Sequence, residues 1–68
     1  MITHDQAQHM ITLHLLLMRQ APTRWHQQSA MHALMIDLDL LLSCGVITEE
    51  QESAARSEAK RIEEEVAV

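Results

Sequence analysis

The sequence has very few of the residues that make turns. Its 68 residues include one glycine, one proline and no asparagine. A β-sandwich or β-barrel needs many turns, and these residue types supply most of them. Leucine, alanine, methionine, glutamate and glutamine are abundant, and all are helix formers. The composition therefore predicts an all-α protein.

Cysteine is almost absent too, and the chain is short. The one cysteine, Cys44, cannot form an internal disulfide. A domain of about 60 residues buries only about 60% of the surface of its unfolded chain. Chains below about 70–80 residues usually need a disulfide, a bound metal or oligomerisation to be stable. Only the last two remain for this chain.

Basic residues and long apolar runs are scarce as well. Ten acidic residues stand against five basic ones, so the net charge is −5, which argues against nucleic acid as a partner. The sequence has no run of 18 apolar residues and therefore predicts no membrane-spanning helix. The first residues also lack the pattern of a secretory signal. An unpaired cysteine then favours a cytoplasmic location.

A first helix is predicted over about residues 4–20. Thr3 and Gln6 have the spacing of a capping box, in which each side chain bonds the backbone N–H of the other residue. Pro22 pushes Ala21 out of the helical region, so the helix ends near that point.

Two further helices follow, and together the three form a single domain over 1–68. Thr23 is the expected N-cap of a helix over about 24–44, and Gly45 suits the left-handed residue that ends it. Thr48 begins a second capping box, which predicts a helix over about 49–65.

The middle helix is apolar on two roughly opposite sides, one with six residues and one with Ala33, Ile36 and Leu40. The other two helices can cover only part of this surface, so we expect a second copy of the chain to cover the rest. The predicted architecture is a three-helix subunit in a homodimeric helical bundle. Its expected dimer or partner interface comprises Met31, Leu34, Met35, Ile36, Leu38, Leu40 and Leu41.

Asp37 falls between these two apolar sides. A buried carboxylate is costly unless it is paired. Counted from the two turns, residue 37 is level with residues 7 and 55, which makes His4 and Arg56 its candidate partners. We predict that Asp37 pairs with Arg56 or else faces the subunit interface; an Asp37 that faces solvent is the alternative.

The five histidines do not have the spacing of metal ligands. His4, His9 and His14 recur every five residues and therefore lie on different sides of a helix. A zinc site needs three or four converging ligands. The sequence predicts no metal and no other cofactor, and His14 is expected to be a core or interface residue.

Four residues with the character of an interaction hot spot flank the proline. Arg19, Arg24, Trp25 and His26 lie on either side of Pro22, and tryptophan and arginine are enriched in hot spots. The alternative is that Trp25 packs over the end of the first two helices.

The sequence has no glycine-rich phosphate loop and no nucleophile motif. A chain of this length also has little room for a substrate pocket, and we therefore expect no enzymatic activity. We expect a small, acidic, regulatory protein-binding module: a homodimeric adaptor, inhibitor or regulator. Its size and plain helical build are similar to those of bacterial, plasmid or phage accessory proteins. One alternative is a helical-hairpin regulator of RNA or DNA, which resembles plasmid copy-control RNA-binding proteins in topology alone. Another is a structural subunit of a larger assembly.

Overall fold

The chain folds into three α-helices joined by two short links. The computed structural model describes residues 2–66, with α1 over His4–Gln20, α2 over Arg24–Ser43 and α3 over Glu49–Val66. The described residues include no β-strand. The prediction of an all-α chain with three helices is confirmed. Compared with the predicted ranges, α1 is the same, α2 ends one residue earlier and α3 ends one residue later.

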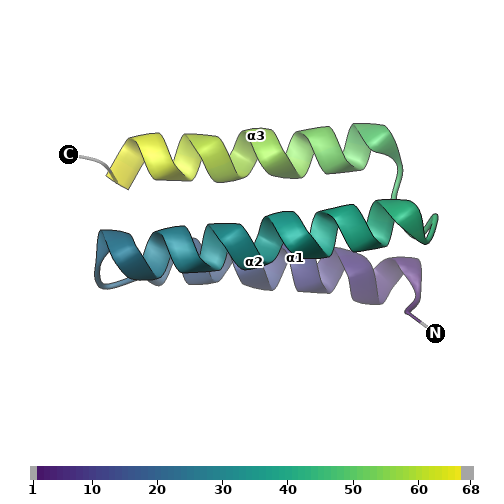
Figure 1. Ribbon diagram of the computed structural model, residues 1–68, viewed down its shortest axis with the longest axis horizontal. Coiled ribbons are helices and arrows are strands. Elements are labelled where there is room, and N and C mark those ends of the chain that lie inside the picture. The colour runs from purple at the N-terminus through teal and green to yellow at the C-terminus, as the bar shows by residue number, and fades with distance from the viewer. Residues whose placement is uncertain (1, 67–68) are drawn as a thin grey trace.

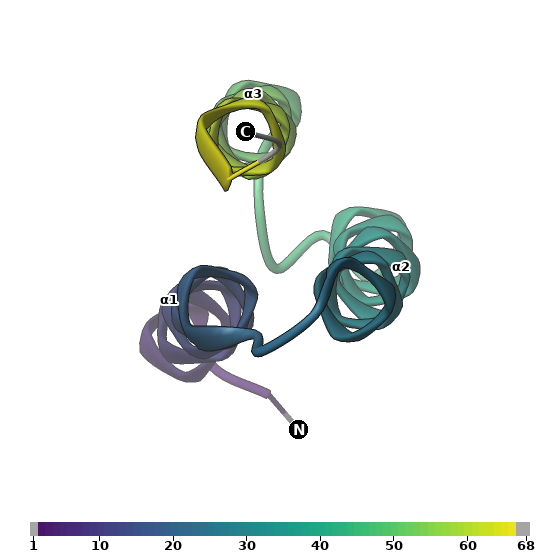
Figure 2. The same ribbon diagram turned by 90° about the vertical axis from the view of Figure 1, so that its left-hand side faces the viewer.

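The helices form an elongated up-down-up bundle with dimensions of 37 × 19 × 16 Å. Consecutive helices run in opposite directions, and the amino-terminus and carboxyl-terminus lie at opposite ends (Figure 1). Viewed end-on, α1 and α2 lie side by side, and α3 covers one side of this pair (Figure 2). No helix among the described residues lies over the other side of the α1–α2 hairpin (Figure 2).

Short side chains begin each helix, as the sequence predicts. The Gln6 N–H donates to Thr3 Oγ1 at 3.1 Å, and the Thr3 N–H donates to Gln6 Oε1 at 2.9 Å, which completes the capping box. Gln51 and Thr48 repeat the same two bonds at the start of α3. Thr23 caps α2 by accepting the N–H of His26. These bonds satisfy donors that have no partner within the helix.

Gly45 ends α2 in the left-handed conformation, with φ of +73°. The Gly45 N–H donates to the carbonyl of Leu42 at 3.0 Å, and the Val46 N–H donates to that of Leu41 at 2.9 Å. This pair of bonds is the Schellman motif, which turns the chain sharply toward α3.

The core lies along the line where the three helices meet. Its largest fully buried side chains are Met18 of α1, Leu34 and Leu38 of α2 and Ile62 of α3. Elsewhere α3 contributes only small residues to this core, because the other buried positions on that helix are alanines. The full core comprises Ala7, Ile11, Met18, Leu34, Leu38, Leu41, Ile47, Ala55, Ala59 and Ile62.

Candidate protein-interaction site

The two apolar sides of α2 have different surroundings. Leu34, Leu38 and Leu41 are buried in the core. Ile36 and Leu40 are on the other side of the helix and remain 48% and 58% exposed. One of the two apolar sides is therefore covered within the chain, and the other is open.

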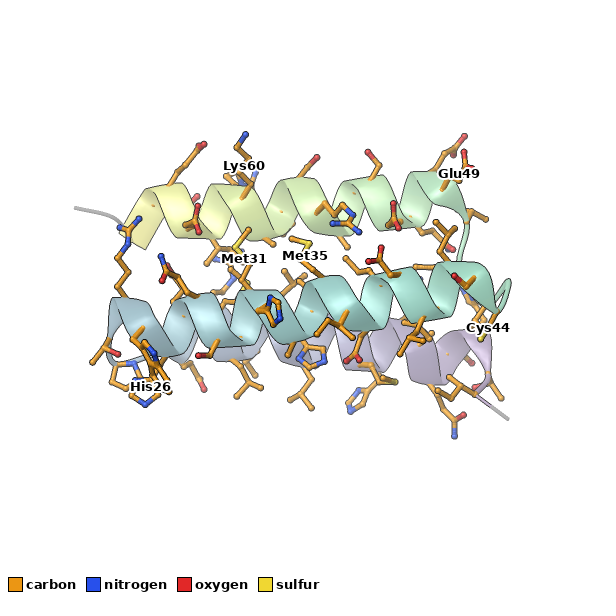
Figure 3. All side chains as sticks on the ribbon, in the orientation of Figure 1. His26, Met31, Met35, Cys44, Glu49 and Lys60 are labelled. Carbon is orange, nitrogen blue, oxygen red and sulfur yellow. The ribbon has the colours of Figure 1, made fainter. Side chains whose placement is uncertain are left out.

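This division corrects part of the predicted interface. The three buried leucines are core residues, because α1 and α3 already cover them. Met31 and Met35 lie between α2 and α3, where they pack against the core (Figure 3). Of the seven residues expected at an interface, Ile36 and Leu40 alone remain substantially exposed. The sequence could not show which side of α2 the other helices would cover.

Helix α1 adds two leucines to this open surface. Leu13 and Leu17 lie one turn apart, and both are nearly half exposed. They flank His14, which contacts α2, whereas Arg19 turns to α3 and pairs with Glu58. Helical periodicity therefore places both leucines on the side of the hairpin away from α3. We call the set Leu13, Leu17, Ile36 and Leu40 the hairpin face.

A histidine–carboxylate pair lies at the seam between α1 and α2 in this face. His14 Nε2 and Asp37 Oδ2 are 2.5 Å apart, and both side chains are mostly buried. The other ring nitrogen of His14, Nδ1, is buried and has no hydrogen-bond partner. The pair joins α1 to α2 across the hairpin.

The pairing of Asp37 differs from the predicted one. Arg56 bonds Asp39 Oδ1 at 2.6 Å instead, while His4 lies near the carbonyl of Val46. The predicted register of the α1–α2 hairpin assumes a tight turn between the two helices. Ala21 and Thr23 both have extended backbones, so the link is not a tight turn and the register brings His14, rather than residue 7, within reach of Asp37.

Charge is concentrated on the opposite side of the molecule. All seven glutamates are in α3, and Glu49 and Lys60 extend from its outer surface (Figure 3). Three of the five basic residues pair with carboxylates, through Arg19–Glu58, Arg56–Asp39 and Arg61–Glu58. The four residues of the hairpin face carry no charge.

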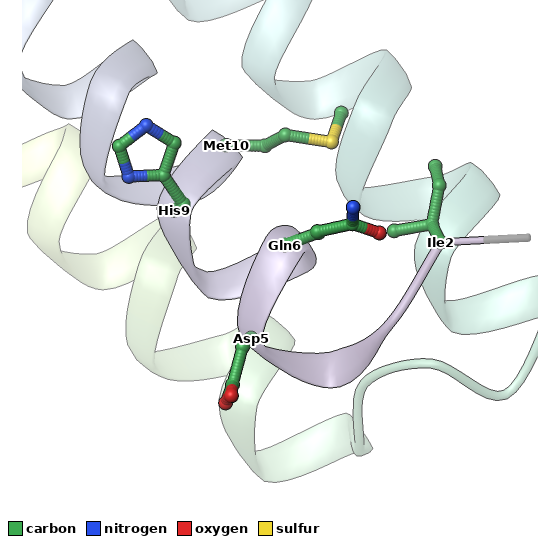
Figure 4. Close-up of a pocket in the computed structure, with 5 residues that line it drawn as sticks. All are labelled: Ile2, Asp5, Gln6, His9 and Met10. Atoms are coloured by element: carbon green, nitrogen blue, oxygen red, sulfur yellow. The ribbon is translucent and has the colours of Figure 1, made fainter.

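An apolar groove opens where the start of α1 meets the end of α2. Its volume is about 700 Å³, and we call it the terminal groove. Ile2 also lines a second hollow of about 490 Å³ along α1, in which the Gln6 and Met10 side chains extend toward Ile2 (Figure 4). The terminal groove is lined by Ile2, His4, Leu40, Leu41, Cys44, Gly45 and Val46.

Trp25 projects from the start of α2, at the other end of the hairpin. It is 70% exposed and meets the His26 ring edge-on, with ring centres 5.1 Å apart. The alternative prediction, that Trp25 packs over the hairpin end, is therefore wrong. The other expected hot-spot residues, Arg19, Arg24 and His26, are exposed as well, and Arg19 pairs with Glu58 of α3.

Other kinds of site receive no support from residues 2–66. No three His, Cys, Asp or Glu side chains among them converge to hold a metal ion. No helix in this range is long and apolar enough to cross a membrane. Comparisons with protein-family models, with curated proteins and with solved structures gave no match.

Proposed function

We propose that this chain is a non-enzymatic protein-interaction module that forms a homodimer through the hairpin face. In this proposal the dimer acts in the cytosol by binding another protein, as an adaptor, inhibitor or regulator. One observation carries it: four large aliphatic side chains on the two helices of the hairpin stay about half exposed. Exposed apolar surface of this kind marks interaction sites.

The hairpin face can supply a substantial driving force for association. Full burial of a leucine or isoleucine contributes about 1.5–3 kcal/mol, so covering the exposed half contributes about 0.7–1.5 kcal/mol. Four such side chains in each of two copies add up to roughly 6–12 kcal/mol, before the entropic cost of association is subtracted. A self-complementary contact uses the same face twice, which is how most homodimers are built.

The charge distribution favours a second copy of the chain over a nucleic acid as the partner. The chain carries −5 overall, but its glutamates lie on α3, and Asp37 at the seam of the hairpin is hydrogen-bonded to His14. Two hairpin faces can therefore meet without strong repulsion. Nucleic-acid binding needs free cations along one surface. Arg19, Arg56 and Arg61 are instead bound to carboxylates.

The test is the dimer dissociation constant of an Ile36→Glu variant, measured by sedimentation equilibrium. Loss of the exposed half of Ile36 from both copies removes about 1.5–3 kcal/mol of association free energy. We therefore expect the dimer dissociation constant to rise at least roughly tenfold. Ser57→Glu is the matched control, because it adds the same charge at an exposed position on α3. Equal dissociation constants for Ile36→Glu and Ser57→Glu would contradict the proposal.

A further inference from the structure

The α1–α2 hairpin has a projecting side chain at one end and an apolar groove at the other. Trp25, the only aromatic residue of Phe, Tyr or Trp type in the chain, projects near the start of α2. The terminal groove lies at the end of the same helix and includes Leu40 and Cys44. Residues 25, 29, 36 and 40 follow the heptad-like spacing of one helix side. The projection and the hollow are therefore joined by one row along α2.

We propose that, in the homodimer, the indole of Trp25 from each copy enters the terminal groove of the other copy. The inference rests on the proposed dimer and specifies how its two copies are arranged. It requires a twofold axis that lies in the interface and crosses the helices, because such an axis exchanges the two ends of the hairpin.

The position of that axis agrees with the sequence. The midpoint between residue 25 and residues 40–44 falls near Ala33, a small and partly buried residue of α2. Small side chains allow two helices to approach closely. A bulky residue at this crossing would hold the two copies apart and keep the indole out of the groove.

Self-complementarity makes a second copy of the chain the occupant of the groove. A largely exposed indole is a large apolar surface that favours a pocket, and the groove is lined mainly by apolar side chains. Both parts belong to one chain and lie at opposite ends of α2, so an isologous contact fills two grooves at once. With a twofold axis parallel to the helices, Trp25 would instead lie beside the partner's Trp25.

Tryptophan fluorescence tests the arrangement directly, because Trp25 is the only tryptophan and the chain has no tyrosine. In protein shown by sedimentation to be dimeric, we expect blue-shifted emission that resists quenching by iodide. Dilution to the monomer should give the emission of a water-exposed indole. A dimer whose indole stays exposed would overturn the arrangement and leave the proposed dimer standing. A chain that is monomeric at every concentration would overturn both.

Crosslinking distinguishes the two possible axes. In a Ser29→Cys variant, a short thiol-specific crosslinker should join residue 29 of one copy to the native Cys44 of the other, because residue 29 lies one turn from Trp25. Links from residue 29 to residue 29, or from 44 to 44, would show that the axis runs along the helices and contradict the proposal.

Truncation of the indole gives a quantitative check. Trp25→Ala should weaken the dimer about 10²- to 10³-fold, because each hot-spot contact is lost twice. Trp25 is exposed in the single chain, so the variant should fold normally. Leu16→Ala is the control, since Leu16 is also an exposed apolar residue, and helical periodicity places it on the side of α1 opposite His14, away from α2. An equally small effect of both substitutions would refute the insertion of Trp25.

Discussion

The His14–Asp37 pair gives a quantitative test of how α1 is joined to α2. Replacement of Asp37 with leucine leaves His14 Nε2 without its partner, and Nδ1 of the same ring already has none. An unpaired polar group in a mostly buried position costs about 1–3 kcal/mol. The converse His14→Leu substitution leaves a carboxylate against apolar side chains and should cost a similar amount. The double substitution removes both polar groups, so it should be nearly neutral or stabilising.

A double-mutant cycle measures this difference. Urea unfolding of the four proteins, at one protein concentration, should show each single variant less stable by about 1–3 kcal/mol, with the double variant less destabilised than either. For a chain of this size, each kcal/mol corresponds to a shift of about 4–8 °C in Tm. Single variants within about 0.5 kcal/mol of the parent, or effects that simply add, would refute the reasoning.

Three further substitutions test the fold. Gly45→Ala should lower the free energy of unfolding by about 1–2 kcal/mol, because φ is +73°; Gly45→Asn should cost less in the same urea titration. Ala59→Leu should destabilise the chain by about 1–3 kcal/mol by overpacking the seam of α3, and an unchanged Tm would contradict this packing. Arg56→Ala should accelerate amide hydrogen exchange in α3, because Arg56 bonds Asp39 of α2; Lys60→Ala, on the outer surface of α3, should not.

Local sequence signals located the helices well. Thr3, Thr23 and Thr48 each begin a helix at the predicted position, because a capping hydrogen bond depends only on residues within the next turn. The signal that Gly45 gives for the end of α2 is equally local, since its left-handed conformation suits a residue without a side chain. Features of this kind can be predicted from spacing alone.

The candidate site depends on how the helices are placed relative to one another. The sequence indicated two apolar sides on α2, but only the packing of α1 and α3 shows that Ile36 and Leu40 are the exposed ones. The partner of Asp37 was missed for the same reason, because the extended link changes the register of the hairpin. Helical spacing groups Leu17 with the core residues of α1 and places Leu13 just outside them, so the sequence does not distinguish these two exposed leucines from the buried ones.

The central claim is that the hairpin face is covered by a second copy of the chain. Sedimentation equilibrium of the wild-type protein over a range of micromolar concentrations measures this most directly. The account predicts a mass of twice the 7.8 kDa chain mass that falls toward the single-chain value on dilution. A mass of one chain at every concentration would contradict it.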